Sequence, residues 1–170
     1  MAEAAPPARR LDFRTWEQVL AEVDRLAATG CTRTGAWDLG QVCVHLALPI
    51  EGTIDGVNLP ATWLQRHVLG PIIKRVLFRT RHIPRGVKAP EIALPGEQPD
   101  QAAAVNRLRA AIDRFRSYNG PLSPHPIFGR LSRDEWEQFH LIHAAHHLSL
   151  LLPSPGSDAS KGTAGSPAPL

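Results

Sequence analysis

Four stretches of this chain each open with a helix-capping signal and continue with apolar residues spaced three or four apart. The caps are Thr15 with Gln18, Asp38 with Gln41, Ser132 with Glu135, and Asp100 alone. Behind each cap the apolar residues fall on one face of a helix, and no alternating strand pattern accompanies them. The pattern therefore predicts an all-α protein built from packed amphipathic helices.

We expect these helices at about residues 16–28, from 39 onward, at 101–118 and at 133–152. Pro49 should bend or loosen the second helix, because proline lacks the amide that a helix interior needs. Residues 57–99 are rich in proline and glycine, with a helix expected around 62–78 that Pro71 must start, kink or divide. The predicted fold is an antiparallel four-helix bundle with a Pro-rich, partly helical insertion between helices 2 and 3.

The length and composition fit one folded domain. The 170 residues are 43% hydrophobic and 21% charged, which excludes wholesale disorder. We expect a flexible N-terminus at 1–10, the helical domain at 11–152 and a disordered tail at 153–170, where apolar periodicity ends. No secretory or membrane-spanning segment is evident, so we expect a cytoplasmic protein. Cys31 and Cys43 form no CxxC pair and should be reduced thiols.

The net charge of +3 hides an uneven distribution. Residues 57–90 contain no acid and seven cations: Arg66, Lys74, Arg75, Arg79, Arg81, Arg85 and Lys88. Such a block could face phosphates, an anionic substrate or a membrane surface, or it could be a solvated helix face with a basic loop. No aromatic-interleaved pattern or reader helix accompanies it, so we expect no specific nucleic-acid partner.

Four of the eight histidines lie in the run HLIHAAHH, residues 140–147. His140, His143 and His147 continue the stripe that starts at Trp136 and should face the core. Burying an imidazole without a partner is costly. This row of histidines therefore needs hydrogen-bond partners, a metal ion or a water-filled cavity.

Of these three alternatives, a shared metal ion makes the most specific prediction. His143 and His147 are one helical turn apart, so both rings can reach one ion at about 2.0–2.1 Å. His45, on the second helix, can be aimed at the same point inside a bundle. Three imidazoles leave one coordination position open, as in catalytic rather than structural sites. The alternative is a set of core histidines bonded to carbonyls and water.

The remaining histidines carry weaker expectations. His140 could be a fourth ligand, a proton shuttle or a pocket wall. We expect His146 to lie off the stripe, where it is either exposed or in contact with one of the metal-binding histidines. We expect His125 to lie in a loop.

Other candidate side chains give no catalytic or cofactor-binding assignment. Trp37 and Trp136 should be core aromatics, whereas Trp63 is expected to line a pocket. Cys43 lies about 200° around the helix from His45 and should point away from the metal. Glu51 is off the face of His45, so no general acid or base is assigned.

Two motifs resemble the DinB/YfiT-like superfamily of metal-binding four-helix bundles: WDLGQVCVHL at residues 37–46 and HAAHHLSLLL at 143–152. More narrowly, the chain resembles an uncharacterised subfamily (a domain of unknown function) across about residues 10–152. The resemblance implies a DinB-like four-helix bundle domain with His45, His143 and His147 as metal ligands. Many superfamily members follow the second histidine of the pair with Arg-Gly-Gln, whereas Leu148, Ser149 and Leu150 stand here.

The resulting hypothesis is a divalent-metal-dependent enzyme acting on a small-molecule substrate. It would be a thiol-dependent transferase or a hydrolase, with zinc or nickel expected and iron, manganese or copper left open. A low-molecular-weight thiol could bring its carboxylates to the cations between Arg66 and Lys88. The alternative is a non-enzymatic metal-binding or homodimeric scaffold module.

Overall fold

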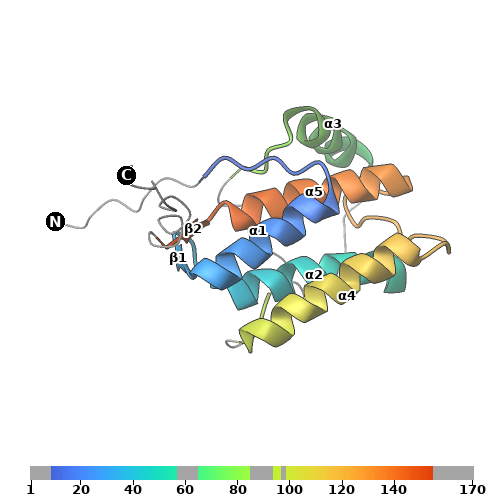
Figure 1. Cartoon of the computed structure of the whole chain (residues 1–170). Coiled ribbons are helices and arrows are strands. Elements are labelled where there is room, and N and C mark those ends of the chain that lie inside the picture. The colour runs from blue at the N-terminus through green and yellow to red at the C-terminus, as the bar shows by residue number, and fades with distance from the viewer. Residues whose placement is uncertain (1–8, 57–64, 85–93, 97–98, 155–170) are drawn as a thin grey trace, which may run out of the picture.

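The computed structural model describes residues 9–56, 65–84, 94–96 and 99–154, and these are mainly helical (Figure 1). The four longest helices are α1 (Trp16–Thr29), α2 (Leu39–Asp55), α4 (Gln101–Ser117) and α5 (Arg133–Leu148). A π-helical turn, η1 (Gln65–Leu69), leads into the shorter α3 (Gly70–Thr80). Pro71 lies in the first turn of α3, so it starts this helix.

The predicted caps form as expected. Thr15, Asp38 and Ser132 each accept a hydrogen bond from the backbone amide three residues on, and the side chain at that position bonds back to the cap. The Asp100 side chain accepts from the amide of Ala103 at 2.8 Å. These caps satisfy amides that a helix start leaves unpaired, and they fix where each helix begins.

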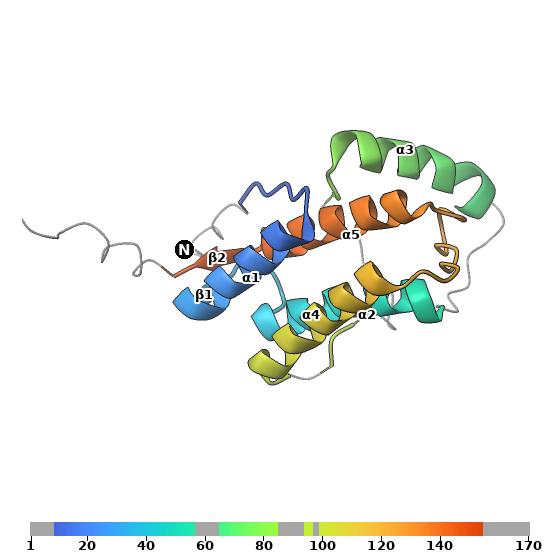
Figure 2. The same cartoon turned by 45° about the vertical axis from the view of Figure 1, so that its right-hand side comes forward.

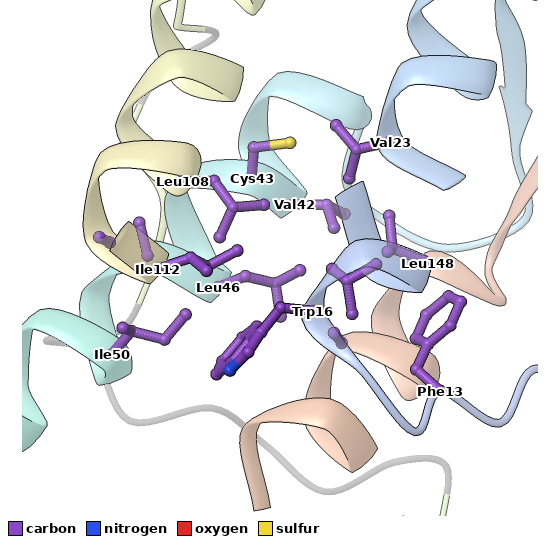
Figure 3. Packing of buried hydrophobic residues seen from close by; sticks show 14 of the residues in the cluster. Phe13, Trp16, Val23, Val42, Cys43, Leu46, Ile50, Leu108, Ile112 and Leu148 are labelled. Atoms are coloured by element: carbon purple, nitrogen blue, oxygen red, sulfur yellow. The ribbon is translucent and has the colours of Figure 1, made fainter. Parts of the chain in front are cut away.

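One hydrophobic core joins the four long helices. α2 packs along α4 and α5, and α1 contacts the other three. Figure 3 shows Trp16 of α1 among side chains of α2 and α4, such as Leu46 and Leu108. On the outer side, Arg107 binds the Glu51 carboxylate with two hydrogen bonds, and Arg114 binds Asp55 in the same way. α2 and α4 are thus held together both inside the core and at the surface.

A small antiparallel sheet, which the sequence did not predict, closes one end of the molecule. β1 (Cys31–Arg33) pairs with β2 (Leu151–Pro153), with Cys31 opposite Pro153. Strands of three residues are too short to show alternation in the sequence, and about 120 residues separate these two. Pro153, the expected start of the tail, belongs to this sheet, and the amide of Ser154 donates to the Gly30 carbonyl at 3.0 Å.

The predicted helix 133–152 was too long, because α5 ends at Leu148. The Leu150 carbonyl accepts the Thr34 amide at 2.8 Å, and Leu151 is already in the sheet. Pro153 also disfavours helical backbone at the residue before it. Leu150 therefore lies beyond the end of α5.

α3 stands apart from the other helices. Figures 1 and 2 both show it beside α5, on the side away from α2 and α4. Lys74 of α3 pairs with Glu135 of α5 at 2.6 Å, and Gln138 of α5 donates to the Phe78 carbonyl at 3.3 Å. No described helix is both long and apolar enough to cross a bilayer.

Some expectations concern residues that the structure does not describe. These include Trp63 as a pocket wall, the cations Arg85 and Lys88, residues 1–8 and the tail from residue 155.

Arg9, at the start of the described chain, pairs with Glu22 at 2.6 Å, and its amide donates to the Ser149 carbonyl at 3.0 Å.

Candidate metal centre

The structure brings His45, His143 and His147 together, as the sequence predicts. The Nε2 atom of His45 in α2 lies 3.1 Å from the Nε2 atoms of both His143 and His147 in α5. One ligand atom from each residue lies within 4.8 Å of the other two, so the three residues could hold one metal ion. His45 is buried, whereas His143 and His147 are half-buried.

A shared metal ion explains this convergence better than hydrogen bonds among the three rings. A neutral imidazole nitrogen carries either one N–H or one lone pair, which two neighbouring nitrogens would have to share. Two other nitrogens lie at 3.1 Å from the same His45 Nε2. A cation, in contrast, accepts a lone pair from each of the three rings at once.

The spacing also fits a shared ion. Two nitrogens bound to one ion at about 2.0–2.1 Å are roughly 2.9 Å apart at a right angle and roughly 3.4 Å apart at the tetrahedral angle. The observed 3.1 Å lies between these values. The spacing and the donor set therefore suit a divalent metal ion that accepts neutral imidazole ligands.

Burial keeps the two α5 imidazoles neutral, which metal binding requires. It lowers the pKa of His147 to about 3, with smaller contributions from His45 and His146. Burial, followed by the neighbouring His147 and His45, places the pKa of His143 well below its usual value. Both lone pairs are therefore available at neutral pH.

Two aromatic side chains flank the three histidines. The Trp37 ring lies 4.5 Å from the His45 ring and stacks at 5.5 Å on the His147 ring. Phe139 stacks at 5.8 Å on the His143 ring. Trp37 packs against the hydrophobic core, as expected, but neither of these ring contacts was predicted from the sequence. Phe139 lies one turn before His143, and that spacing could have revealed it.

His140 lies outside the group of three and has a different role. It is buried, and its Nε2 atom lies 3.0 Å from the Thr53 hydroxyl of α2. A cavity of about 10 Å³, lined by Trp16, His140 and His143 among others, adjoins it. A cavity of that size holds about one water molecule. The structure therefore favours the pocket-wall interpretation of His140 over the fourth-ligand one.

His125 and His146 also lie outside the group of three. His125 is in the loop before α5, where its Nδ1 accepts the amides of Ile127 and Phe128 at 3.1 Å each. Burial lowers the pKa of His125 to about 4. The His146 ring packs edge-on against the His147 ring at 4.8 Å.

The acids and the thiol nearest to His45 in the sequence make their contacts away from the three histidines. Glu51 binds Arg107, and Asp38 caps α2. Cys43 points into the hydrophobic core beside Val23 and Leu108 (Figure 3), where burial raises the pKa of its thiol to about 12. Both Cys31 and Cys43 are free thiols, as expected.

Comparison with known families adds one finding. The sequence profile of a family described as "Protein of unknown function (DUF1569)" matches residues 6–154. The chain belongs to this family. Searches of curated proteins and of solved structures each found no match. The DUF1569 match includes all three clustered histidines, together with Trp37 and Phe139.

Proposed function

We propose that this DUF1569 protein is a divalent-metal-dependent enzyme whose ion is held by His45, His143 and His147. The observation that carries the proposal is the convergence of three Nε2 atoms from two helices, with two of the separations at 3.1 Å. His45 is 98 residues from His143 and 102 from His147, so the fold has assembled the cluster from two distant segments.

The group offers three ligands rather than four. Among the described residues, no cysteine, aspartate or glutamate joins the three histidines. Structural zinc sites are normally closed by four protein ligands, whereas catalytic sites keep one position open for water or substrate. The partial exposure of His143 and His147 supports access from solvent.

We also propose that the arrangement is a DinB-like four-helix bundle. Four long helices share one core, and the ligands come from the second and the last of these four. The motifs WDLGQVCVHL and HAAHHLSLLL lie at the corresponding positions. A resemblance of fold does not fix the reaction, so the chemistry must be argued from the site itself.

The surroundings of the cluster favour a thiol substrate. A bound divalent ion would supply Lewis acidity, which lowers the pKa of a thiol or water that coordinates to it. Among the described residues, no carboxylate belongs to the cluster to act as a general base. A thiol, with an ordinary pKa near 8.5, needs far less help to ionise than water does. Trp37 and Phe139 flank the site with apolar ring faces. We therefore place a thiol-dependent transferase ahead of a hydrolase.

The metal content of protein purified without a histidine tag tests the site. Elemental mass spectrometry should find about one ion per chain, zinc or nickel, in the wild type. His143→Ala should lose the ion while its circular dichroism stays helical. The matched control is His146→Ala, because His146 is on the same helix but outside the group. Protein that holds no zinc, nickel or manganese after reconstitution would overturn the proposal.

A second experiment tests the reaction class. Metal-loaded protein would be incubated with common low-molecular-weight thiols and a broad panel of electrophiles, with His143→Ala as the inactive control. Metal-dependent consumption of one thiol is expected. If no thiol binds or reacts while the metal is present, the transferase fails and a hydrolase screen follows.

The alternative is a non-enzymatic metal-binding module or a homodimeric scaffold. The exposed apolar side chains of α3 are the observation in its favour, since such a face can join two copies. Sedimentation analysis of the metal-loaded protein separates a monomer from a dimer.

A further inference from the structure

The helix α3 is amphipathic, but its apolar side faces away from the rest of the protein. Its apolar stripe faces outward, with Val68, Leu69, Ile72, Ile73 and Val76 each 42–60% exposed. These residues recur at intervals of one, three and four, which places them on one side of η1 and α3. Only Gly70 and Leu77 are buried in α3. A surface helix normally turns its charged face to water, so this stripe needs an explanation.

Contacts on the opposite side fix the stripe in this orientation. Lys74 pairs with Glu135 of α5 at 2.6 Å. Arg81, which ends the helix in a left-handed conformation, pairs with Asp12 at 2.7 Å. Gln138 donates to the Phe78 carbonyl. The inward face of α3 thus carries the paired Lys74 and the buried Leu77, and the apolar stripe remains outside.

Two further cations border the stripe. Arg75 and Arg79 are exposed, and within the described residues no acid pairs with either one. They are four residues apart on the helix, a spacing at which like charges repel each other and destabilise the helix. An anion between them would remove that repulsion. The sequence from 57 to 90 contains no acid that could do so.

We propose that the outer face of η1 and α3 docks on an anionic phospholipid surface. An apolar stripe bordered by arginines is the pattern of a helix that lies in the membrane interface. Ile72, Ile73 and Val76 would enter the acyl boundary, and Arg75 and Arg79 would bind lipid phosphates. If two copies of the chain paired through antiparallel α3 helices, Arg75 and Arg79 of one copy would face the same arginines of the other. No acid would lie between them to neutralise the charge. Charge therefore favours lipid over a second copy of the chain.

Vesicle flotation of the full-length protein tests this surface. One set of vesicles is pure phosphatidylcholine, and the other contains phosphatidylglycerol. Binding is expected only to the second set, and it should weaken as salt is raised. Arg75→Gln/Arg79→Gln should reduce partitioning by about fivefold for each arginine. Ile72→Ser/Val76→Ser should abolish binding without loss of helicity.

The matched control is Arg10→Gln/Arg130→Gln, which removes two exposed charges elsewhere and should bind like the wild type. Equal binding to both kinds of vesicle, or binding unaffected by Arg75→Gln/Arg79→Gln, would overturn the role of the arginines. A dimer in solution that Ile72→Ser/Val76→Ser dissociates, with no vesicle binding, would assign the face to a second copy instead. A monomer that binds no vesicles would also sink the proposal. None of these outcomes depends on whether the protein binds a metal ion.

Discussion

The Nε2 atom of His140 lies 3.0 Å from the hydroxyl oxygen of Thr53, and this contact joins α5 to α2 inside the core. The Thr53 hydroxyl donates to the Pro49 carbonyl at 2.8 Å, so it accepts the N–H of His140. Thr53 is two turns beyond His45, and His140 is three residues before His143. The hydrogen bond therefore holds together the two helices that carry the clustered histidines.

Thr53→Val should destabilise the protein, because the buried His140 N–H would lose its acceptor. Leaving a buried donor unpaired costs about 1–3 kcal/mol. Urea unfolding of metal-free protein at pH 7 measures the loss. Thr29→Val, at the end of α1, is the matched control and should change stability by less than about 0.5 kcal/mol. Equal stability of the Thr53 variant and the wild type would contradict this role.

Trp37 should report ion binding through its fluorescence, because its ring lies 4.5 Å from the His45 ring. A quenching divalent ion such as nickel or copper, titrated into apo protein, is expected to reduce tryptophan emission. Trp37→Phe should lose most of that response while still binding the ion by elemental analysis. Trp136→Phe keeps Trp37 and should retain the response. Undiminished quenching in Trp37→Phe would place the ion elsewhere.

His125 should make stability fall in mild acid. Burial lowers its pKa from about 6.5 to about 4 in the folded protein. Between these values the unfolded chain takes up a proton that the folded protein does not bind, so stability falls as pH falls. Above pH 6.5 the residue is neutral in both states and contributes no pH dependence.

His125→Asn is the variant that isolates this effect. An asparagine oxygen can accept the amides of Ile127 and Phe128, as the His125 Nδ1 does, but it does not titrate. From pH 7 to pH 4 the wild type should lose on the order of 3 kcal/mol more than the variant, at about 1.4 kcal/mol per pKa unit. Urea unfolding at each pH checks this. Parallel curves for the two proteins would show that His125 is not the titrating group.

The sequence predicted the helices and the three clustered histidines because both depend on local spacing. Capping signals and apolar periodicity located the starts of α1, α2, α4 and α5 to within a residue. The pair His143 and His147 follows from the helical period alone. Local spacing alone does not place His45 beside this pair, because the packing of the helices decides which face of α2 lies against α5.

The features that the sequence did not predict depend on distant contacts. The pairing of Cys31 with Pro153 has no local signal, and it shortens α5 from the expected residue 152 to Leu148. Trp37 looked like a core aromatic, yet its ring meets two histidines, one of them 110 residues away. The outward direction of the α3 stripe likewise appears only when Lys74 is seen to face Glu135.

The β1–β2 pairing also has a consequence for how the protein is made. Leu148 and Leu151 complete the core around α1, so the packing of the first helix is incomplete until the last residues of the domain have been synthesised. At 5–20 residues per second, the interval between the end of α1 and the arrival of β2 is on the order of ten seconds. During that time α1 lacks the contacts that it makes with α5 and β2. Folding of this domain should therefore finish only after residue 153 has left the ribosome.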